Sequence, residues 1–113
     1  MKRGEIYFAD LDPAVGDEIK KMRPVLIISN NANNNVAKTI TVIPITSNVN
    51  KVYPFEVLLN VNESGMIKTS KAQCHQIRTI SKSRITNKTI QGVVSHSILI
   101  KIKLALKLHL DLN

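Results

Sequence analysis

A short apolar run with no polar position, Val25 to Ile28, constrains the fold of this chain most strongly. A strand whose side chains are all apolar is typical of one that is covered on both faces. Arg23 and Pro24 precede the run, so the arginine stands where the core meets solvent, and the proline biases it away from helical geometry. The sequence therefore predicts an arginine that leaves a buried strand in a preset direction. An ion pair with Asp17 or Glu18 is the purely structural alternative.

The first two thirds of the sequence predict short strands joined by polar loops. Apolar and β-branched patterns indicate strands at residues 5–9, 25–28, 39–46, 55–61, 66–68 and 72–80, and loops at 13–22 and 30–35. In the first strand, Ile6 and Phe8 alternate with Glu5 and Tyr7. Pro44 cannot donate a hydrogen bond to a neighbouring strand, so it implies an edge position or a bulge.

Several short strands with few helical stretches indicate a mainly β fold with short helices. We expect a small SH3-like barrel with a C-terminal helix. At 113 residues, the chain is long enough for one core, so a single domain over residues 1–113 is expected.

The C-terminal segment fits two patterns. Apolar residues alternate with lysines from Ile100 to Leu110, which is a strand period, but Ser95 is a suitable N-cap and the residues from Leu104 onward are good helix formers. We predict a helix. It would carry one apolar stripe with Ile98, Leu99, Ile102, Ala105 and Leu106, and a second with Ile100, Leu104 and Leu108. A second apolar stripe in so small a domain suggests a partner subunit.

The charge of the chain is unevenly distributed. Sixteen Lys and Arg residues against eight Asp and Glu give a net charge of +8, and no acidic residue occurs between Ser64 and Leu110. A surface of this kind attracts polyanions, either nucleic acid or an acidic protein segment. Net charge alone equally fits a generally basic protein.

Nothing in the sequence indicates secretion or a membrane. The single cysteine, Cys74, cannot form an internal disulfide and has no zinc-ligand spacing around it. The first residues lack the apolar stretch of a signal peptide, and no apolar run approaches membrane-spanning length. We therefore expect a cytoplasmic protein with no membrane association.

Two predicted strand ends carry residues suited to chemistry. Thr46 and Ser47 end an apolar strand as Arg23 begins one, and Glu18, His75 and Gln76 are further polar groups near such ends. No phosphate-binding glycine loop, carboxylate metal cluster or Ser-His-Asp pattern is present, so any catalysis is expected to need no metal and no cofactor.

These residue types could cleave RNA through attack of the ribose 2′-hydroxyl on its own phosphate. The reaction needs a base, an acid for the leaving 5′-oxygen and a cation for the phosphorane. Arg23 suits the cation role because its guanidinium is forked and permanently charged. Its pKa makes it a poor base, so chemistry alone favours Glu18 or His75 as the base.

Several motifs occur together in a recognisable order. They are residues 2–7, Asp12-Pro13 with Gly16 and Glu18, residues 23–29, Ile45-Thr46-Ser47, residues 53–57 and residues 76–80. In order and spacing over residues 2 to 85, the chain resembles the MazF/PemK-like toxin family. The resemblance implies an SH3-like barrel homodimer that is the toxin of a type II toxin-antitoxin system. It implies a metal-independent endoribonuclease that cuts single-stranded RNA, usually mRNA, within a short sequence.

The resemblance also implies roles for particular residues. Arg23 and Thr46 match the catalytic arginine and threonine of the family, and Glu18 matches an acidic loop residue. The remaining candidates for RNA binding or auxiliary acid–base chemistry are Asp17, Lys20, Lys21, Asn30, Ser47, Tyr53, Pro54, His75 and Gln76. Aromatic stacking and edge hydrogen bonds are the usual means of reading single-stranded RNA. The implied partner is a cognate antitoxin with an acidic, initially disordered segment.

The chain departs from the family at two places. Lys20-Lys21-Met22 stands where relatives usually have a glycine before the arginine, and His75 stands where many have an acid. Both changes bear on which nucleobases of the RNA the chain would recognise. Two alternatives are a gyrase-binding toxin of the same barrel without nuclease activity and a non-catalytic nucleic-acid-binding barrel.

Overall fold

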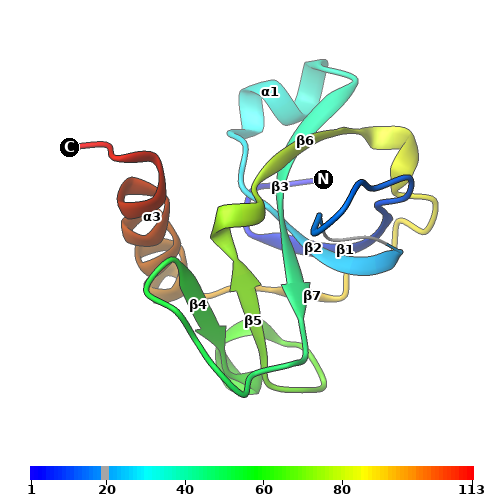
Figure 1. The fold of residues 1–113 in the computed structure, drawn as a ribbon. Coiled ribbons are helices and arrows are strands. Elements are labelled where there is room, and N and C mark those ends of the chain that lie inside the picture. Colours follow the sequence, from blue (N-terminus) through cyan, green and yellow to red (C-terminus); the bar gives the residue numbers. More distant parts are fainter. Residues whose placement is uncertain (19–20) are drawn as a thin grey trace.

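A computed structural model describes residues 1–18 and 21–113. Its strands are β1 (Glu5–Asp10), β2 (Met22–Ile27), β3 (Thr39–Thr46), β4 (Glu56–Leu59), β5 (Ser70–Gln73), β6 (Arg78–Ser81) and β7 (Gly92–Val93). Its helices are α1 (Asn31–Val36), α2 (Val61–Ser64) and α3 (His96–Leu110), with 3-10 turns η1 (Cys74–Gln76) and η2 (Lys82–Arg84). The antiparallel strands form one curled sheet in the order β4-β5-β3-β2-β1-β7, with β6 also paired to β3 (Figure 1).

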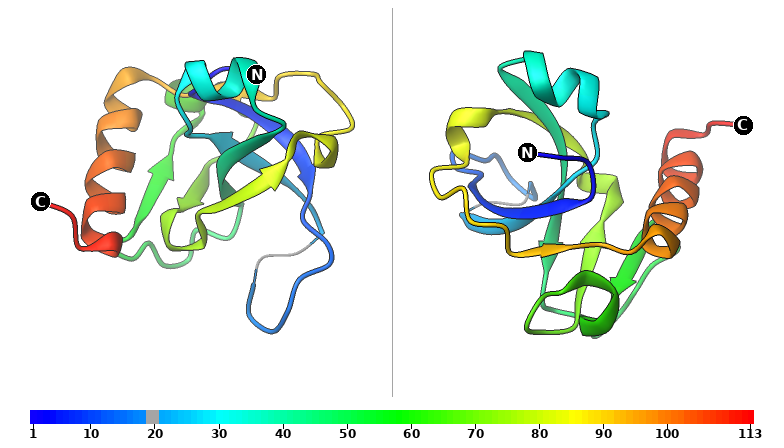
Figure 2. Two further views of the ribbon diagram at one scale, coloured as in Figure 1. Left: turned by 90° about the horizontal axis from the view of Figure 1, so that it is seen from above. Right: turned by 180° about the vertical axis from the view of Figure 1, so that it is seen from behind.

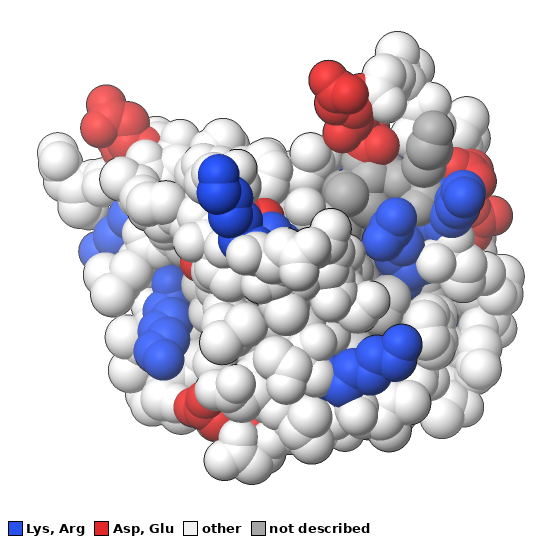
Figure 3. All heavy atoms as spheres, turned by 60° about the horizontal axis from the view of Figure 1, so that its bottom comes forward, with Lys and Arg blue, Asp and Glu red and all other residues white. Residues whose placement is uncertain are grey.

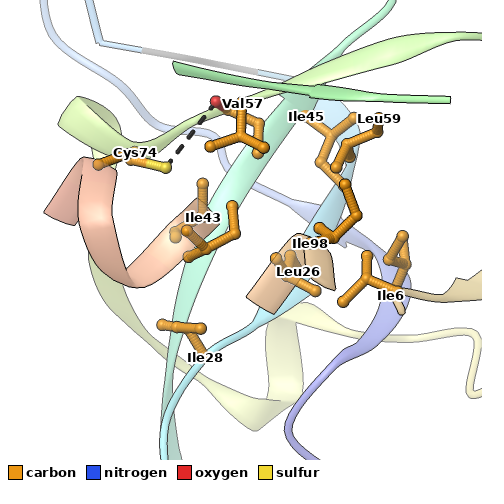
Figure 4. Packing of buried hydrophobic residues seen from close by; sticks show 13 residues of the cluster. Ile6, Leu26, Ile28, Ile43, Ile45, Val57, Leu59, Cys74 and Ile98 are labelled. Carbon is orange, nitrogen blue, oxygen red and sulfur yellow. Dashed lines mark hydrogen bonds between the residues drawn. The ribbon is translucent and has the colours of Figure 1, made fainter. Parts of the chain in front are cut away.

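Both faces of the middle strands are covered because the sheet curls around one core and carries α3 on its other side (Figure 2). The core toward α3 includes Ile6, Leu26, Ile43, Ile45, Val57, Leu59, Ala72, Ile98 and Ile102 (Figure 4). The core inside the curl includes Tyr7, Ala9, Leu11, Val25, Ile27, Ile40, Val42, Ile80 and Ile85. The uninterrupted apolar run in β2 thus supplies both cores, and the expected mainly β barrel with a C-terminal helix is confirmed.

The last segment is the helix that the sequence predicts. Ser95 caps α3, its hydroxyl oxygen accepting a hydrogen bond from the Ile98 N–H at 3.2 Å. Ile98, Ile102 and Ala105 are buried against the sheet, whereas the second stripe, Ile100, Leu104 and Leu108, is exposed. Within residues 1–18 and 21–113, no helix has both the length and the apolar character needed to cross a membrane.

Several expected strands and loops take other forms. The expected loop at 30–35 is largely α1, because Asn30 caps the helix and the buried Asn34 amide bonds to Ser29. Residues 66–68 form no strand. The expected strand at 72–80 is interrupted by η1 between β5 and β6, and Val61 begins α2 instead of ending β4.

Two expectations about individual strand positions differ from the structure. Of the edge position or bulge expected at Pro44, the edge position is wrong: Pro44 is buried in the central strand β3, at the break where the partner on one side changes from β6 to β5. Tyr7 is buried and Phe8 is partly exposed, the reverse of the expected alternation. Both faces of β1 meet a core, so Tyr7 enters the curl, whereas Phe8 lies beside a surface pocket.

Candidate functional site

Arg23 and Thr46 lie on neighbouring strands and on the same face of the sheet. Val25 pairs with Pro44 in the antiparallel register of β2 and β3, and continuing this register by two residues brings Arg23 opposite Thr46. Directly opposed residues of an antiparallel pair project to the same face. That face is the inner face of the curled sheet, whose apolar residues form the core inside the curl. The side chains of Arg23 and Thr46 therefore lie at the edge of this core, which we call the rim.

Lys71 extends this arrangement to a third strand. It is paired with Thr46 in the register of β3 and β5, and it is buried. Arg23, Thr46 and Lys71 therefore form a row across β2, β3 and β5, which we call the rim row. In the sequence, Lys71 is distinguished only as one of the basic residues in the stretch without acidic residues between Ser64 and Leu110.

A pocket of about 250 Å³ lies beside the rim row. Arg23, Thr46 and Ser47 contribute to its lining, together with Phe8, Met22, Pro24, Ile45, Met66, Ile67, Lys68 and Ser70. The Thr46 hydroxyl oxygen accepts a hydrogen bond from the Asn48 N–H at 3.2 Å, which leaves the hydroxyl hydrogen able to donate to a ligand. The arrangement joins a guanidinium, a hydroxyl donor and an apolar wall.

An aromatic segment lies next to Lys71. The rings of Tyr53 and Phe55 are stacked with their centroids 5.5 Å apart. The rings of Phe55 and His75 meet edge to face, with their centroids 4.5 Å apart. The Lys71 Nζ lies 5.8 Å from the centroid of the Tyr53 ring. Tyr53 and Pro54 are exposed, so this segment offers a surface on which a nucleobase can stack.

His75 and Gln76 are half-buried in η1, and His75 also faces His109 of α3, with ring centroids 6.3 Å apart. Burial lowers the pKa of His75, and the neighbouring charges of His109 and Lys71 lower it further, against an opposing effect of Glu56. The imidazole of His75 is therefore neutral at neutral pH. Its Nδ1 is buried and makes no hydrogen bond within the described residues.

The loop between β1 and β2 carries Asp17, Glu18 and Lys21, and residues 12–18 extend away from the barrel (Figure 2). Asp17 and Glu18 are exposed, and the Glu18 Oε1 accepts a hydrogen bond from the Val15 N–H at 2.6 Å. Lys20 lies outside the described residues.

Lys21 takes a left-handed backbone conformation, with φ of 72°. Glycine is the residue that adopts this conformation without steric cost. The loop thus keeps a glycine-like backbone at Lys21, which is held by a hydrogen bond of 3.0 Å from its N–H to Asp12 Oδ1.

Asn30 is not brought to the rim row. It follows the opposite end of β2 from Arg23, and its side chain accepts a hydrogen bond from the Asn33 N–H at 2.8 Å as the cap of α1. Ser47, in contrast, lies beside Thr46 and is exposed at the pocket.

Some of the basic side chains have structural partners within the chain and are not available for a ligand. On the face drawn in Figure 3, most Lys and Arg side chains stand apart, separated by uncharged surface. Arg84 Nη1 donates to the carbonyl oxygens of Asp10 and Asp12 at 3.0 and 2.5 Å, and so fixes the start of the β1–β2 loop. Part of the positive charge is therefore structural.

Comparisons with known proteins identify the relatives of this chain. A family model described as "PemK-like, MazF-like toxin of type II toxin-antitoxin system" matches residues 2–110. The chain is 46% identical to "Endoribonuclease MazF9" of Mycobacterium tuberculosis, covering 99% of this chain and 98% of that one. It is 42% identical to "Endoribonuclease EndoA" of Bacillus subtilis, covering 78% and 77%. A solved structure titled "Endoribonuclease in complex with its cognate antitoxin from Mycobacterial species" superposes with a TM-score of 0.80 at 25% identity, covering 100% and 97%.

Proposed function

The chain belongs to the PemK-like, MazF-like toxins of type II toxin-antitoxin systems, and from this premise we propose that it is an endoribonuclease that cuts single-stranded mRNA at a short sequence. The observation that carries the proposal is the rim row, which places a guanidinium opposite a hydroxyl on neighbouring strands. A gyrase-binding toxin has no need of a phosphate clamp at this place. A nucleic-acid-binding barrel could use one, but the curated relatives at 46% and 42% identity are named endoribonucleases, which favours the nuclease.

In the proposed reaction, the ribose 2′-oxygen attacks its own phosphorus and the bond to the 5′-oxygen breaks. The products are a 2′,3′-cyclic phosphate, which can open to a 3′-phosphate, and a 5′-hydroxyl. Arg23 donates hydrogen bonds to the phosphorane oxygens as their negative charge develops, which is the largest single contribution in many enzymes. Thr46 donates its hydroxyl hydrogen to the same phosphate and orients it.

The 2′-hydroxyl gives up a proton as it attacks, and the leaving 5′-oxygen takes one up as its bond to phosphorus breaks. We assign Arg23 a share in this proton transfer, because its side chain would lie against the phosphate that it binds with Thr46. Its high intrinsic pKa makes this an unfavourable base, so two other groups compete for the role. His75 is neutral at neutral pH and able to accept a proton. Glu18 is the other, but one of its carboxylate oxygens already accepts the Val15 N–H.

The test is incubation of the purified chain with a long RNA in excess EDTA. We expect discrete fragments that carry 5′-hydroxyl ends. An RNA with 2′-deoxyribose at the cut nucleotide should stay intact, because it lacks the attacking group. Arg23→Ala should slow cleavage by a factor of about 100 to 1,000, the usual effect of removing one charge-stabilising donor. Intact RNA with the unaltered chain, or full activity of the Arg23→Ala variant, would contradict the proposal.

The proposal includes a homodimer and an antitoxin. The exposed stripe of Ile100, Leu104 and Leu108 on α3 is an apolar face for a second copy to cover. Leu104→Asp should therefore give a monomer by light scattering, whereas a monomeric unaltered chain would contradict the dimer. The antitoxin would offer an acidic segment to this basic chain, and the pair would act in the cytoplasm as a single-domain toxin and its inhibitor.

A further inference from the structure

Lys71 and Glu56 form a buried ion pair at the end of the rim row. The Lys71 Nζ lies 2.9 Å from the Glu56 Oε1 and 2.6 Å from the carbonyl oxygen of Lys51. The side chain of Lys71 is 10% exposed and that of Glu56 is 2% exposed. Because Lys71 pairs with Thr46, the ion pair adjoins the proposed reaction centre.

This ion pair anchors the aromatic segment at several points. The Glu56 Oε1 accepts a hydrogen bond from the Tyr53 N–H at 3.0 Å, and the Glu56 N–H donates to the Tyr53 carbonyl oxygen at 2.8 Å. Lys71 binds the Lys51 carbonyl oxygen and places its ammonium near the Tyr53 ring. The chain from residue 51 to residue 56 is thus fixed at both ends to the same two charges.

Stability alone does not account for such a pair. Removing two charges from water is costly, and replacing a buried ion pair with apolar residues of similar volume is often neutral or stabilising. What apolar residues would not reproduce is the directed set of hydrogen bonds to the backbone of Lys51 and Tyr53. The consequence of the pair is therefore geometric: it sets where the Tyr53 and Phe55 rings lie relative to Thr46.

We propose that Lys71 and Glu56 are positioning residues for RNA recognition, holding the Tyr53–Phe55 stack beside Thr46 so that a base next to the cut phosphate finds its stacking surface preformed. This inference rests on the proposed function. It predicts that loss of the pair weakens RNA binding while the groups that act on the phosphate still work. The effect should appear in KM and not in kcat.

Variants of Lys71 provide the kinetic test. Lys71→Met removes the ammonium but keeps an unbranched side chain, and we expect it to raise KM about tenfold, as the loss of one stacked base would, with kcat within about threefold. Lys71→Arg restores a cation and should recover most of the loss. Lys103→Met removes the same charge from the exposed face of α3 and should leave KM within about twofold. An unchanged KM in Lys71→Met would overturn the proposal, as would a loss confined to kcat.

A double variant guards against misfolding. Lys71→Met alone leaves the Glu56 carboxylate buried without its cation, so the single variant can fail to fold. Lys71→Met with Glu56→Leu replaces both charges and should unfold as cooperatively as the unaltered chain, yet show the same rise in KM. A folded double variant with the original KM would show that the pair has no positioning role.

A structural readout separates this inference from the nuclease itself. The chain has two tyrosines and no tryptophan, so Tyr7→Phe leaves Tyr53 as the single tyrosine for NMR. The stacked Phe55 ring should shift the Tyr53 ring resonances upfield, in the parent and in Lys71→Arg but not in Lys71→Met. If the unaltered chain cuts no RNA, the proposed function fails, but this measurement still decides the positioning. Upfield resonances retained in Lys71→Met would overturn it.

Discussion

Two segments flank the rim row, and they are held in different ways. Residues 51–56 are tied to β5 by Lys71, whose partners lie 15 and 20 residues away in the sequence. In the β1–β2 loop, the hydrogen bonds of residues 13–18 join Val15 and Glu18 to each other. The segment 51–56 is fixed to the sheet. In the β1–β2 loop, Arg84 and Lys21 hold the described ends, whereas the described residues 13–18 are joined by bonds within the loop.

This difference indicates how the two sides would contribute to RNA recognition. A surface held by a buried ion pair is preorganised, so a base that stacks on it loses little free energy to ordering the protein. A loop closed by its own contacts can be changed in sequence without disturbing the sheet. We expect the segment 51–56 to supply affinity and the β1–β2 loop to supply sequence preference.

The largest expected effect concerns the fixed segment. Glu56→Gln leaves the Lys71 ammonium buried without its counter-charge and should lower the free energy of unfolding by about 3 kcal/mol. Burial raises the pKa of Glu56, but hydrogen bonds from Tyr53 and Lys71 and the nearby positive charges outweigh it, so the pKa is below the ordinary value of 4.5. The stabilisation is therefore complete above pH 4.5 and is lost as the pH falls through the lower, folded-state pKa.

Urea unfolding of both forms across the acid range checks this prediction. The difference between the unaltered chain and Glu56→Gln should shrink as the pH falls. A difference that stays constant in acid would show that the charge of Glu56 is not what stabilises the segment.

Thr46→Val tests the row that lies between the two segments. Valine keeps the β-branched shape but removes the hydroxyl, so a hydrogen bond to the phosphate is lost and single-turnover cleavage should slow about tenfold. Thr41→Val, a hydroxyl loss on the same strand away from the pocket, is the matched control and should cut at the original rate. Equal cleavage rates for the unaltered chain, Thr46→Val and Thr41→Val would show that the Thr46 hydroxyl has no role in the reaction.

Lys21→Gly tests whether the backbone conformation of Lys21 in the β1–β2 loop lowers the stability of the chain. The left-handed conformation costs about 1–2 kcal/mol at Lys21 because this residue has a Cβ. Glycine avoids this cost, but its greater conformational entropy in the unfolded state offsets part of the gain in stability. The variant should gain about 0.5–1 kcal/mol in the free energy of unfolding. Lys21→Ala removes the same charge but keeps the Cβ, and it should show no such gain in thermal unfolding. A gain in both variants would point to charge instead of backbone conformation.

Glu18→Gln has the smallest expected effect on the reaction. Glutamine retains an oxygen that can accept the Val15 N–H, so the loop should close as before. Cleavage at a fixed site should change by less than about threefold, whereas loss of a general base costs about 100-fold or more. A loss of about 100-fold in the single-turnover rate would show that Glu18, and not a residue of the rim row, is the general base.

The sequence predicts the middle of the sheet well. The apolar run of β2 requires cover on both faces, and the two cores supply it. The strand-end positions of Arg23 and Thr46 follow from the same patterns. Helix α3 could be chosen over a strand because Ser95 and the helix-forming residues outweigh the alternation of period two.

The rest depends on pairings that local patterns do not determine. Lys71 joins the rim row only because η1 interrupts the segment from residue 70 to residue 81 and shifts its register against β3. Nothing near residues 74–76 in the sequence marks that turn. Asn30 illustrates the converse: it is a polar residue at a predicted strand end, but its side chain caps α1 away from the rim row.

The central claim is that Arg23 and Thr46 act on one phosphate as a unit. A double-mutant cycle of Arg23→Ala and Thr46→Val, followed by single-turnover cleavage of one RNA, tests it most directly. Residues that act as a unit show strongly non-additive losses, so the double variant should be within about threefold of Arg23→Ala alone. A double variant slowed by the full product of the two single losses would show that the residues act independently and would contradict the account.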